Sequence, residues 1–87
     1  MPEENEIQEI VKTALGLIVK SGATGVLQTG LLNCLRRIDG QPLTHEERAY
    51  IWGMLESHGW ITFHIEPMWH NKRWTATVPG VTAYEAM

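Results

Sequence analysis

The sequence predicts a small α+β fold in which three helices are followed by a β-hairpin. Apolar residues recur at helical spacing in three segments, which cover residues 5–21, 29–38 and 44–58. Two later segments, 61–66 and 73–78, instead alternate apolar and polar residues, as half-buried strands do. This change of period after the third helix places the hairpin in the C-terminal half of the fold.

The first helix is predicted from a cap and a long apolar stripe. Asn5 and Gln8 have the spacing of a capping box, in which each side chain satisfies a free amide of the first turn. Leu15 and Val19 widen the stripe, and Gly22 ends the helix. The simpler interpretation is a helix buried on two sides; the alternative is a homodimer contact through Leu15 and Val19. The stripe itself comprises Ile7, Ile10, Val11, Ala14, Leu17 and Ile18.

The segment after the first helix allows two interpretations. Residues 25–28 are short and apolar, which suits a small edge strand, and Thr29 then caps the second helix. The rival interpretation begins the second helix at Thr24 and has no strand, although Gly30 disfavours one uninterrupted helix. In both cases Gly40 follows the helix as a stop signal. The expected apolar face is Leu31, Leu32, Leu35 and Ile38.

The third helix and the hairpin have the clearest signals. Thr44 and Glu47 again have capping-box spacing, and Gly59 stands where a helix usually stops. The two strands follow, with a turn over residues 67–71. The buried stripe of the helix is expected to be Ile51, Met54, Leu55 and His58, and the inward strand positions Ile61, Phe63, Ile65, Trp74, Ala76 and Val78.

A capped helix that enters a hairpin through Leu55, Gly59, Trp60 and Ile61 resembles the recognition helix and wing of the winged helix-turn-helix family. The expected order of elements is similar to that family over residues 5–78. The resemblance implies one winged-helix-like domain over the whole chain. Residues 79–87 are expected to form an extended or frayed tail, because terminal residues are ordered only when other contacts hold them. It also implies that the outward face of the third helix enters the DNA major groove while the hairpin tip contacts the backbone or minor groove.

The outward face of the third helix is acidic when Ile51 and Leu55 point inward. It has two carboxylates, Glu46 and Glu56, and no arginine or lysine. Because carboxylates are repelled by phosphates, we expect this helix to be a poor reader of the groove. The outward positions are His45, Glu46, Ala49, Trp52, Gly53 and Glu56.

The hairpin tip is the stronger candidate, because it joins an aromatic ring, an imidazole, an amide and two cations. Such a set can contact phosphates, stack on a base or hold a protein partner. Trp69 either folds back onto the sheet or is exposed for contact. Arg36 and Arg37, at the end of the second helix, either complement the helix dipole or clamp a phosphate. The candidate residues for binding nucleic acid or a protein are Trp69, His70, Asn71, Lys72, Arg73, Arg36, Arg37, His45, Ala49 and Trp52.

Composition limits the classes of protein that the chain can represent. Its 87 residues, 44% of them hydrophobic, suffice for one domain with a core. The net charge of -3 counts against a role dominated by phosphate binding. Cys34 is the single cysteine, so no internal disulfide is possible, and we expect a buried thiol in a cytoplasmic protein. The acidic start, Met1-Pro2-Glu3-Glu4, is unlike an export signal, and no apolar run is long enough for a membrane span.

No signature of an enzyme, a cofactor or a metal site is present in the sequence. It has no glycine-rich phosphate loop, no nucleophile elbow and no His-Glu-x-x-His pair. Four histidines, His45, His58, His64 and His70, lack the close paired spacing of metal ligands. We expect His58 to be a core histidine.

Two functions of different classes follow from these patterns. The first is a regulator of transcription or of a mobile element that binds double-stranded DNA through the hairpin and the third helix. The alternative is an acidic protein-interaction module, an adaptor or inhibitor of a partner that handles nucleic acid, with Leu15, Val19, Trp52 and Trp69 as its apolar contacts. Salt-dependent binding to a duplex would separate the two.

Overall fold

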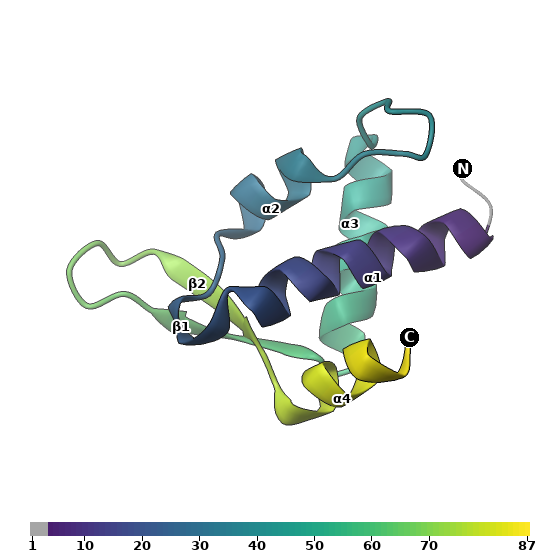
Figure 1. Ribbon diagram of the computed structural model, residues 1–87. Helices are drawn as coiled ribbons and strands as arrows, with labels where there is room; N and C mark the ends of the chain where they lie inside the picture. Colours follow the sequence, from purple (N-terminus) through teal and green to yellow (C-terminus); the bar gives the residue numbers. More distant parts are fainter. Residues whose placement is uncertain (1–3) are drawn as a thin grey trace.

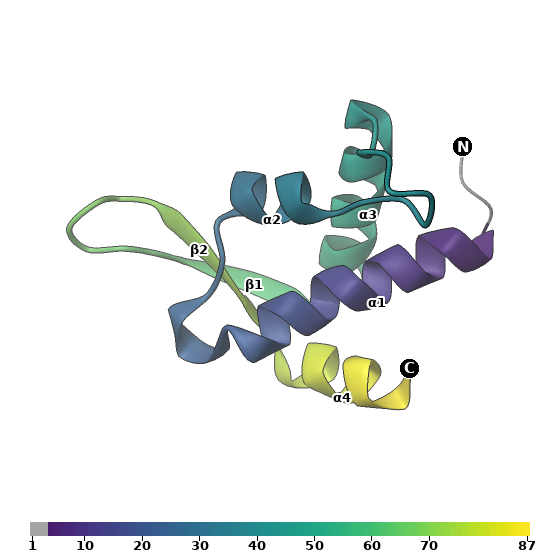
Figure 2. The ribbon, with the colours of Figure 1, turned by 45° about the horizontal axis from the view of Figure 1, so that its top comes forward.

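The computed structural model describes residues 4–87 as a small α+β fold with four α-helices and a two-stranded antiparallel hairpin (Figure 1). The α-helices form a body from which the hairpin projects (Figures 1 and 2). No helix in this part of the chain is long and apolar enough to cross a membrane. The elements are α1 (Glu4–Lys20), the 3-10 turn η1 (Gly22–Thr24), α2 (Gln28–Cys34), α3 (His45–Ser57), β1 (Ile61–Ile65), β2 (Lys72–Ala76) and α4 (Val78–Ala86).

Helix α1 passes through the middle of the body, with α2 on one side and α4 on the other (Figures 1 and 2). It begins at Glu4, so Asn5 lies inside the helix. Leu15 is fully buried, and Val19 is half-buried against the core. Leu15 is therefore not available for the alternative, a homodimer contact through Leu15 and Val19, because α1 is covered on two sides within one chain.

The segment between α1 and α2 forms neither a full strand nor a helix that begins at Thr24. Val26 pairs with Trp74 of β2 through two backbone hydrogen bonds, with N–O distances of 2.9 and 2.8 Å. Gly25 permits this approach, because its φ of 77° is strained for other residues and a Cβ there would crowd the Trp74 carbonyl oxygen. A single-residue bridge thus takes the place of the expected strand at residues 25–28.

Helix α2 is shorter than predicted, because it stops at Cys34 instead of Ile38. Leu35 is already extended, and Arg36 pairs as an isolated bridge with Pro42. The connection to α3 thus begins earlier than the apolar spacing suggested. Cys34 is exposed at the end of the helix, which corrects the expectation of a buried thiol.

Helix α3 begins with the predicted capping box. Thr44 Oγ1 accepts from the Glu47 N–H at 3.2 Å, and the Thr44 N–H donates to Glu47 Oε1 at 2.8 Å. Trp52, expected to face outward, is only 3% exposed. Its ring meets that of Trp74 edge to face at 5.0 Å, because the base of the hairpin covers a second side of α3. His58, expected in the core, is exposed and stacks on Trp60.

The hairpin has the predicted strands, with Phe63 opposite Trp74 and Ile65 opposite Lys72. The expected burial holds only at its base, where Ile61 and Trp74 join the core. Phe63 and Ile65 remain 46% and 47% exposed, because the hairpin extends beyond the helices that could cover it (Figures 1 and 2). Half of the side chains that were predicted to face inward are therefore exposed to solvent.

The expected tail at residues 79–87 is wrong, because most of it belongs to α4. Thr77 caps this helix by accepting from the Gly80 N–H at 3.1 Å, and Val78 opens the helix instead of ending a strand. Gly80 lies directly against the Trp60 carbonyl group, and the Tyr84 ring packs against Gly16 of α1. Two small residues thus allow α4 to close over the body.

Candidate functional site

The hairpin tip presents Trp69 to solvent. Its side chain is 70% exposed, so it does not fold back onto the sheet. The turn is closed by the His70 N–H, which donates to the Glu66 carbonyl at 2.9 Å, and His70 adopts a φ of 58°. Asn71 follows as an exposed residue at the entry to β2. These three candidates therefore share one end of the molecule.

The two cations of the hairpin differ in their surroundings. The Arg73 guanidinium donates from Nε to Glu66 Oε1 at 2.6 Å, so a carboxylate already compensates its charge. Lys72 Nζ lies 4.4 Å above the centre of the Phe63 ring, a cation–π contact that leaves the positive charge unneutralised. Of this pair, Lys72 is the cation available to a ligand.

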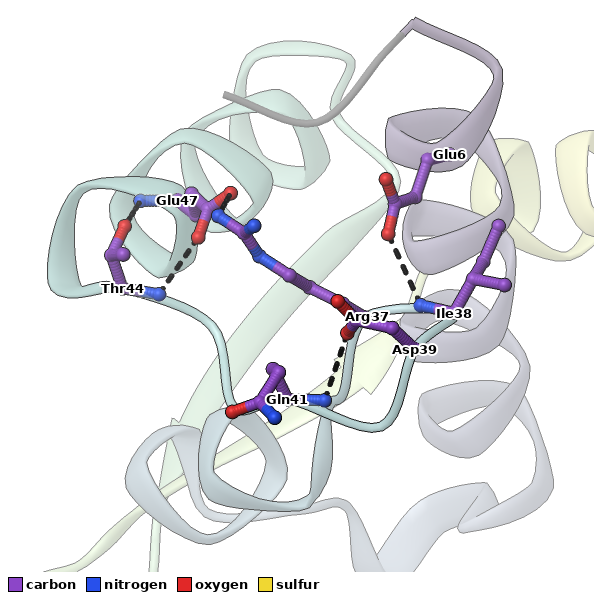
Figure 3. Close-up of polar contacts among 7 residues, drawn as sticks. All are labelled: Glu6, Arg37, Ile38, Asp39, Gln41, Thr44 and Glu47. Carbon is purple, nitrogen blue, oxygen red and sulfur yellow. Dashed lines mark hydrogen bonds and ion pairs between the residues drawn. The ribbon is translucent and has the colours of Figure 1, made fainter.

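Arg37 has a structural role in the body (Figure 3). Its Nη2 donates to Glu47 Oε2 at 2.6 Å, and the Glu47 side chain is almost completely buried. The hydrogen bond from Arg37, followed by that from the Thr44 backbone, lowers the pKa of Glu47 to about 2. The same hydrogen bond raises the pKa of Arg37. Arg37 thus ties the α2–α3 connection to the first turn of α3.

Two further hydrogen bonds to carboxylates stabilise the same connection (Figure 3). The Ile38 N–H donates to Glu6 Oε1 of α1 at 3.1 Å, and the Gln41 N–H donates to Asp39 Oδ1 at 3.0 Å. Arg36 is turned back onto α2, where its Nη1 donates to the carbonyl groups of Asn33 and Leu35. Neither arginine of this pair therefore extends toward the hairpin.

A more coherent set of polar groups lies where α2, the first half of α3 and β2 meet. A depression of about 380 Å³ between α2 and α3 includes His45, Arg48 and Ala49. A neighbouring depression of about 530 Å³ between α2 and β2 includes Asn71 and Lys72. Both are lined by Gln28, Thr29 and Asn33. We call this set the polar surface: Gln28, Thr29, Asn33, His45, Arg48, Ala49, Asn71 and Lys72. The rest of the lining of the two depressions is apolar or glycine: Leu27, Gly30, Leu32 and Trp74.

The polar surface is free of carboxylates. Among the residues that the structure describes, no Asp or Glu lines either depression. Arg48 and Lys72 form no ion pair in residues 4–87, and Arg48 Nε has no hydrogen-bond partner there. Two uncompensated cations thus accompany three side-chain amides on a protein of net charge -3.

The structure redistributes the residues predicted for the site. His45 and Ala49 line one of the two depressions, and Asn71 and Lys72 line the other. Trp52 is buried, and Trp69 and His70 line neither depression. Sequence reasoning missed Gln28, Thr29, Asn33 and Arg48. A helix that begins at Gln28 would have indicated the first three, because residues 28, 29, 32 and 33 share one helical face.

The polar surface offers hydrogen-bond donors and positive charge but no metal-ligand cluster. No group of three or more His, Cys, Asp or Glu side chains within residues 4–87 is placed to hold a metal ion. Comparison of the chain with protein-family models, with curated proteins and with solved structures finds no match. The chemistry of its own surface is therefore the basis for any functional assignment.

Proposed function

We propose that this protein binds double-stranded DNA through the polar surface. The observation behind the proposal is the carboxylate-free junction of α2, α3 and β2, with Arg48 and Lys72 as its uncompensated cations. Local charge, more than net charge, determines where a polyanion is attracted, so a total of -3 does not oppose contact at this junction. The acidic outward residues Glu46 and Glu56 line neither depression.

The residue types of the polar surface suit a duplex. Arginine and lysine contact phosphates, which supplies affinity without sequence preference. Gln28 and Asn33 have amides that can pair with the major-groove edge of adenine, and Thr29 and His45 can donate to phosphate or base oxygens. We therefore assign the two cations to the DNA backbone and the amides of α2 to the bases.

The arrangement of the elements supports the same proposal. The helices α1 to α3, the Val26 bridge and the hairpin follow one another in the order that resembles winged-helix proteins. In that family a helix and a hairpin contact DNA from the same side. Here Asn71 and Lys72 of the hairpin share a depression with α2. By this likeness we propose a small regulator of transcription or of a mobile element.

The alternative of a protein-interaction module loses most of its supporting residues. It relied on the acidic outward face of α3, where Glu46 and Glu56 are exposed, and on four apolar side chains. Of those four, Leu15 and Trp52 are buried and Val19 packs against the core. Only Trp69 remains exposed. DNA binding is the better supported function for the body of the molecule.

Fluorescence anisotropy with a labelled random duplex, measured over a range of salt concentrations, tests the proposal. We expect binding that weakens steeply with salt. The double variant Arg48→Gln with Lys72→Gln should flatten the slope of log K against log salt by about two units, because each lost phosphate contact removes about 0.9.

The matched control is the double variant Lys12→Gln with Lys20→Gln. It removes the same charge from a depression between α1 and Tyr84 of α4. The control should lose far less affinity than the Arg48 and Lys72 variant, and its slope should stay near that of the unmodified protein. No binding at low salt, or equal effects of the two double variants, would contradict the assignment.

A further inference from the structure

The outer edge of β1 carries backbone groups that have no partner strand in residues 4–87. Trp60 and Glu66 are bonded to the β2 side, because the Thr77 N–H donates to the Trp60 carbonyl and the Glu66 N–H to the Asn71 carbonyl. In an antiparallel pair the hydrogen-bonded positions alternate. The N–H and C=O groups of residues 61, 63 and 65 therefore point away from β2.

The position of Trp74 confirms this alternation. Trp74 lies opposite Phe63, and its N–H and C=O groups turn outward from β2 to Val26. Strand β2 is thus bonded on both sides, while β1 is bonded on one. Residues 61–65 contain no proline, no charged residue and no bulge, which are the usual means of protecting an edge strand.

The sequence of β1 is symmetric about Phe63. Isoleucine stands two residues before it and two residues after it, and a small or mid-sized polar residue stands on each side, in the order Ile61, Thr62, Phe63, His64 and Ile65. A strand with this pattern is complementary to an antiparallel copy of itself. A two-fold axis at Phe63 would place apolar residues opposite apolar ones on one face, and Thr62 opposite the partner subunit's His64 on the other.

We propose that β1 pairs with β1 of a second copy of this chain, which forms one four-stranded sheet in the order β2–β1–β1–β2. Ile61 then exchanges two hydrogen bonds with the partner subunit's Ile65, and Phe63 exchanges two with the partner subunit's Phe63. Pairing also places the half-exposed side chains of Phe63 and Ile65 beside apolar side chains of the partner subunit on the same face of the sheet.

Charge does not oppose a second copy at this edge. Each copy has a net charge of -3, yet β1 itself carries no formal charge, and Arg73 compensates the adjacent Glu66. Two copies can therefore meet along β1 without like charges face to face. No residue of β1 lines either depression of the polar surface, so the dimer does not cover that surface, although Lys72 lies over Phe63 and opposite Ile65.

Sedimentation equilibrium of the full chain from about 10 μM to about 500 μM tests the oligomeric state. We expect the mass to rise toward twice 9.9 kDa. Ile65→Lys places a charge on the edge and should raise the dimer dissociation constant at least about tenfold. Ile38→Lys is the matched control, because Ile38 is an exposed isoleucine of the body, and it should associate as the unmodified protein does.

Cysteine cross-linking tests the register in a Cys34→Ser background. Only position 63 faces itself across the two-fold axis, at a Cα separation of about 5.5 Å, which a disulfide can bridge. Mild oxidation should therefore dimerise Phe63→Cys and leave Ile65→Cys monomeric; circular dichroism checks that both variants fold. A mass of one chain at all concentrations, a dimer unaffected by Ile65→Lys, or equal cross-linking at both positions would overturn the proposal. A mass of one chain at all concentrations would exclude a second copy as the partner of this edge and would favour a strand of a different protein.

Discussion

The body and the hairpin use the same kinds of contact with different results. Each has a tryptophan and an arginine–glutamate pair, and both pairs have N–O distances of 2.6 Å. Trp52 of the body is 3% exposed and Trp69 of the hairpin is 70% exposed; the side chains of Glu47 and Glu66 are 3% and 22% exposed. Because burial determines what a contact contributes, equal distances do not imply equal stabilisation. We expect the base of the hairpin to belong energetically to the body, and its outer half to be free for binding.

The largest effect is expected at Trp74, where the two regions join. Trp74→Ala removes a buried ring that contacts both Trp52 and Phe63. Such a truncation should lower the free energy of unfolding by about 3–5 kcal/mol, as measured by urea denaturation. A loss below about 1 kcal/mol would show that the hairpin folds independently of the body.

Gly80→Ala should have the next largest effect, because α4 leaves no room for a side chain there. A Cβ at this position would overlap the Trp60 carbonyl oxygen, and relief of that overlap should lower the free energy of unfolding by about 1–3 kcal/mol. Gly53→Ala is the control, since Gly53 lies in α3 with open space around its Cα. This control should be neutral or stabilise by up to about 1 kcal/mol. Equal losses would mean that α4 does not hold the hairpin base.

A smaller effect, dependent on pH, separates the two ion pairs. The pKa of Glu47 is lowered from 4.5 to about 2 in the folded chain, so its contribution to stability is present above pH 4.5 and is lost as the pH falls toward 2. Glu47→Gln should therefore lower the melting temperature at pH 7. The melting temperatures of the variant and of the unmodified protein should converge as the pH falls toward 2. Glu66→Gln, in the more exposed pair, should change stability at pH 7 by less than about 1 kcal/mol. A larger loss from Glu66→Gln than from Glu47→Gln would reverse the comparison.

The smallest effect on stability is expected at Trp69. Trp69→Ser removes a large ring that the body does not cover, so the free energy of unfolding should stay within about 0.5 kcal/mol of the original. Thermal denaturation followed by circular dichroism measures it. A loss above about 2 kcal/mol would place Trp69 in the folded core.

Local signals explain which parts of the fold could be predicted from sequence. The capping box at Thr44 and Glu47 and the alternation of the strands depend on neighbouring residues, and both are confirmed. The start of α4 also had a local signal, Thr77 followed by Pro79, but the tail was judged by its position near the chain end. Alternation indicated which face Phe63 occupies but not whether other elements would cover that face.

The site was harder to predict, because its groups come from three elements. Gln28, Asn33 and Arg48 become neighbours only when α2 ends early and packs against α3. Arg37 and Arg73 were candidates for binding, yet each is compensated by a carboxylate, ten residues later for Arg37 and seven residues earlier for Arg73. Trp52 is buried by the hairpin base, and the spacing of apolar residues within α3 does not predict this contact.

The packing of Tyr84 against Gly16 bears on how the chain is made. It joins α4 to α1, the last and first elements of residues 4–87, so the body cannot be completed until Tyr84 has left the ribosome. Contacts between residues so far apart in sequence slow folding, because a long loop must close before the contact forms. During synthesis the side of α1 that α4 later covers therefore stays open to solvent until α4 docks.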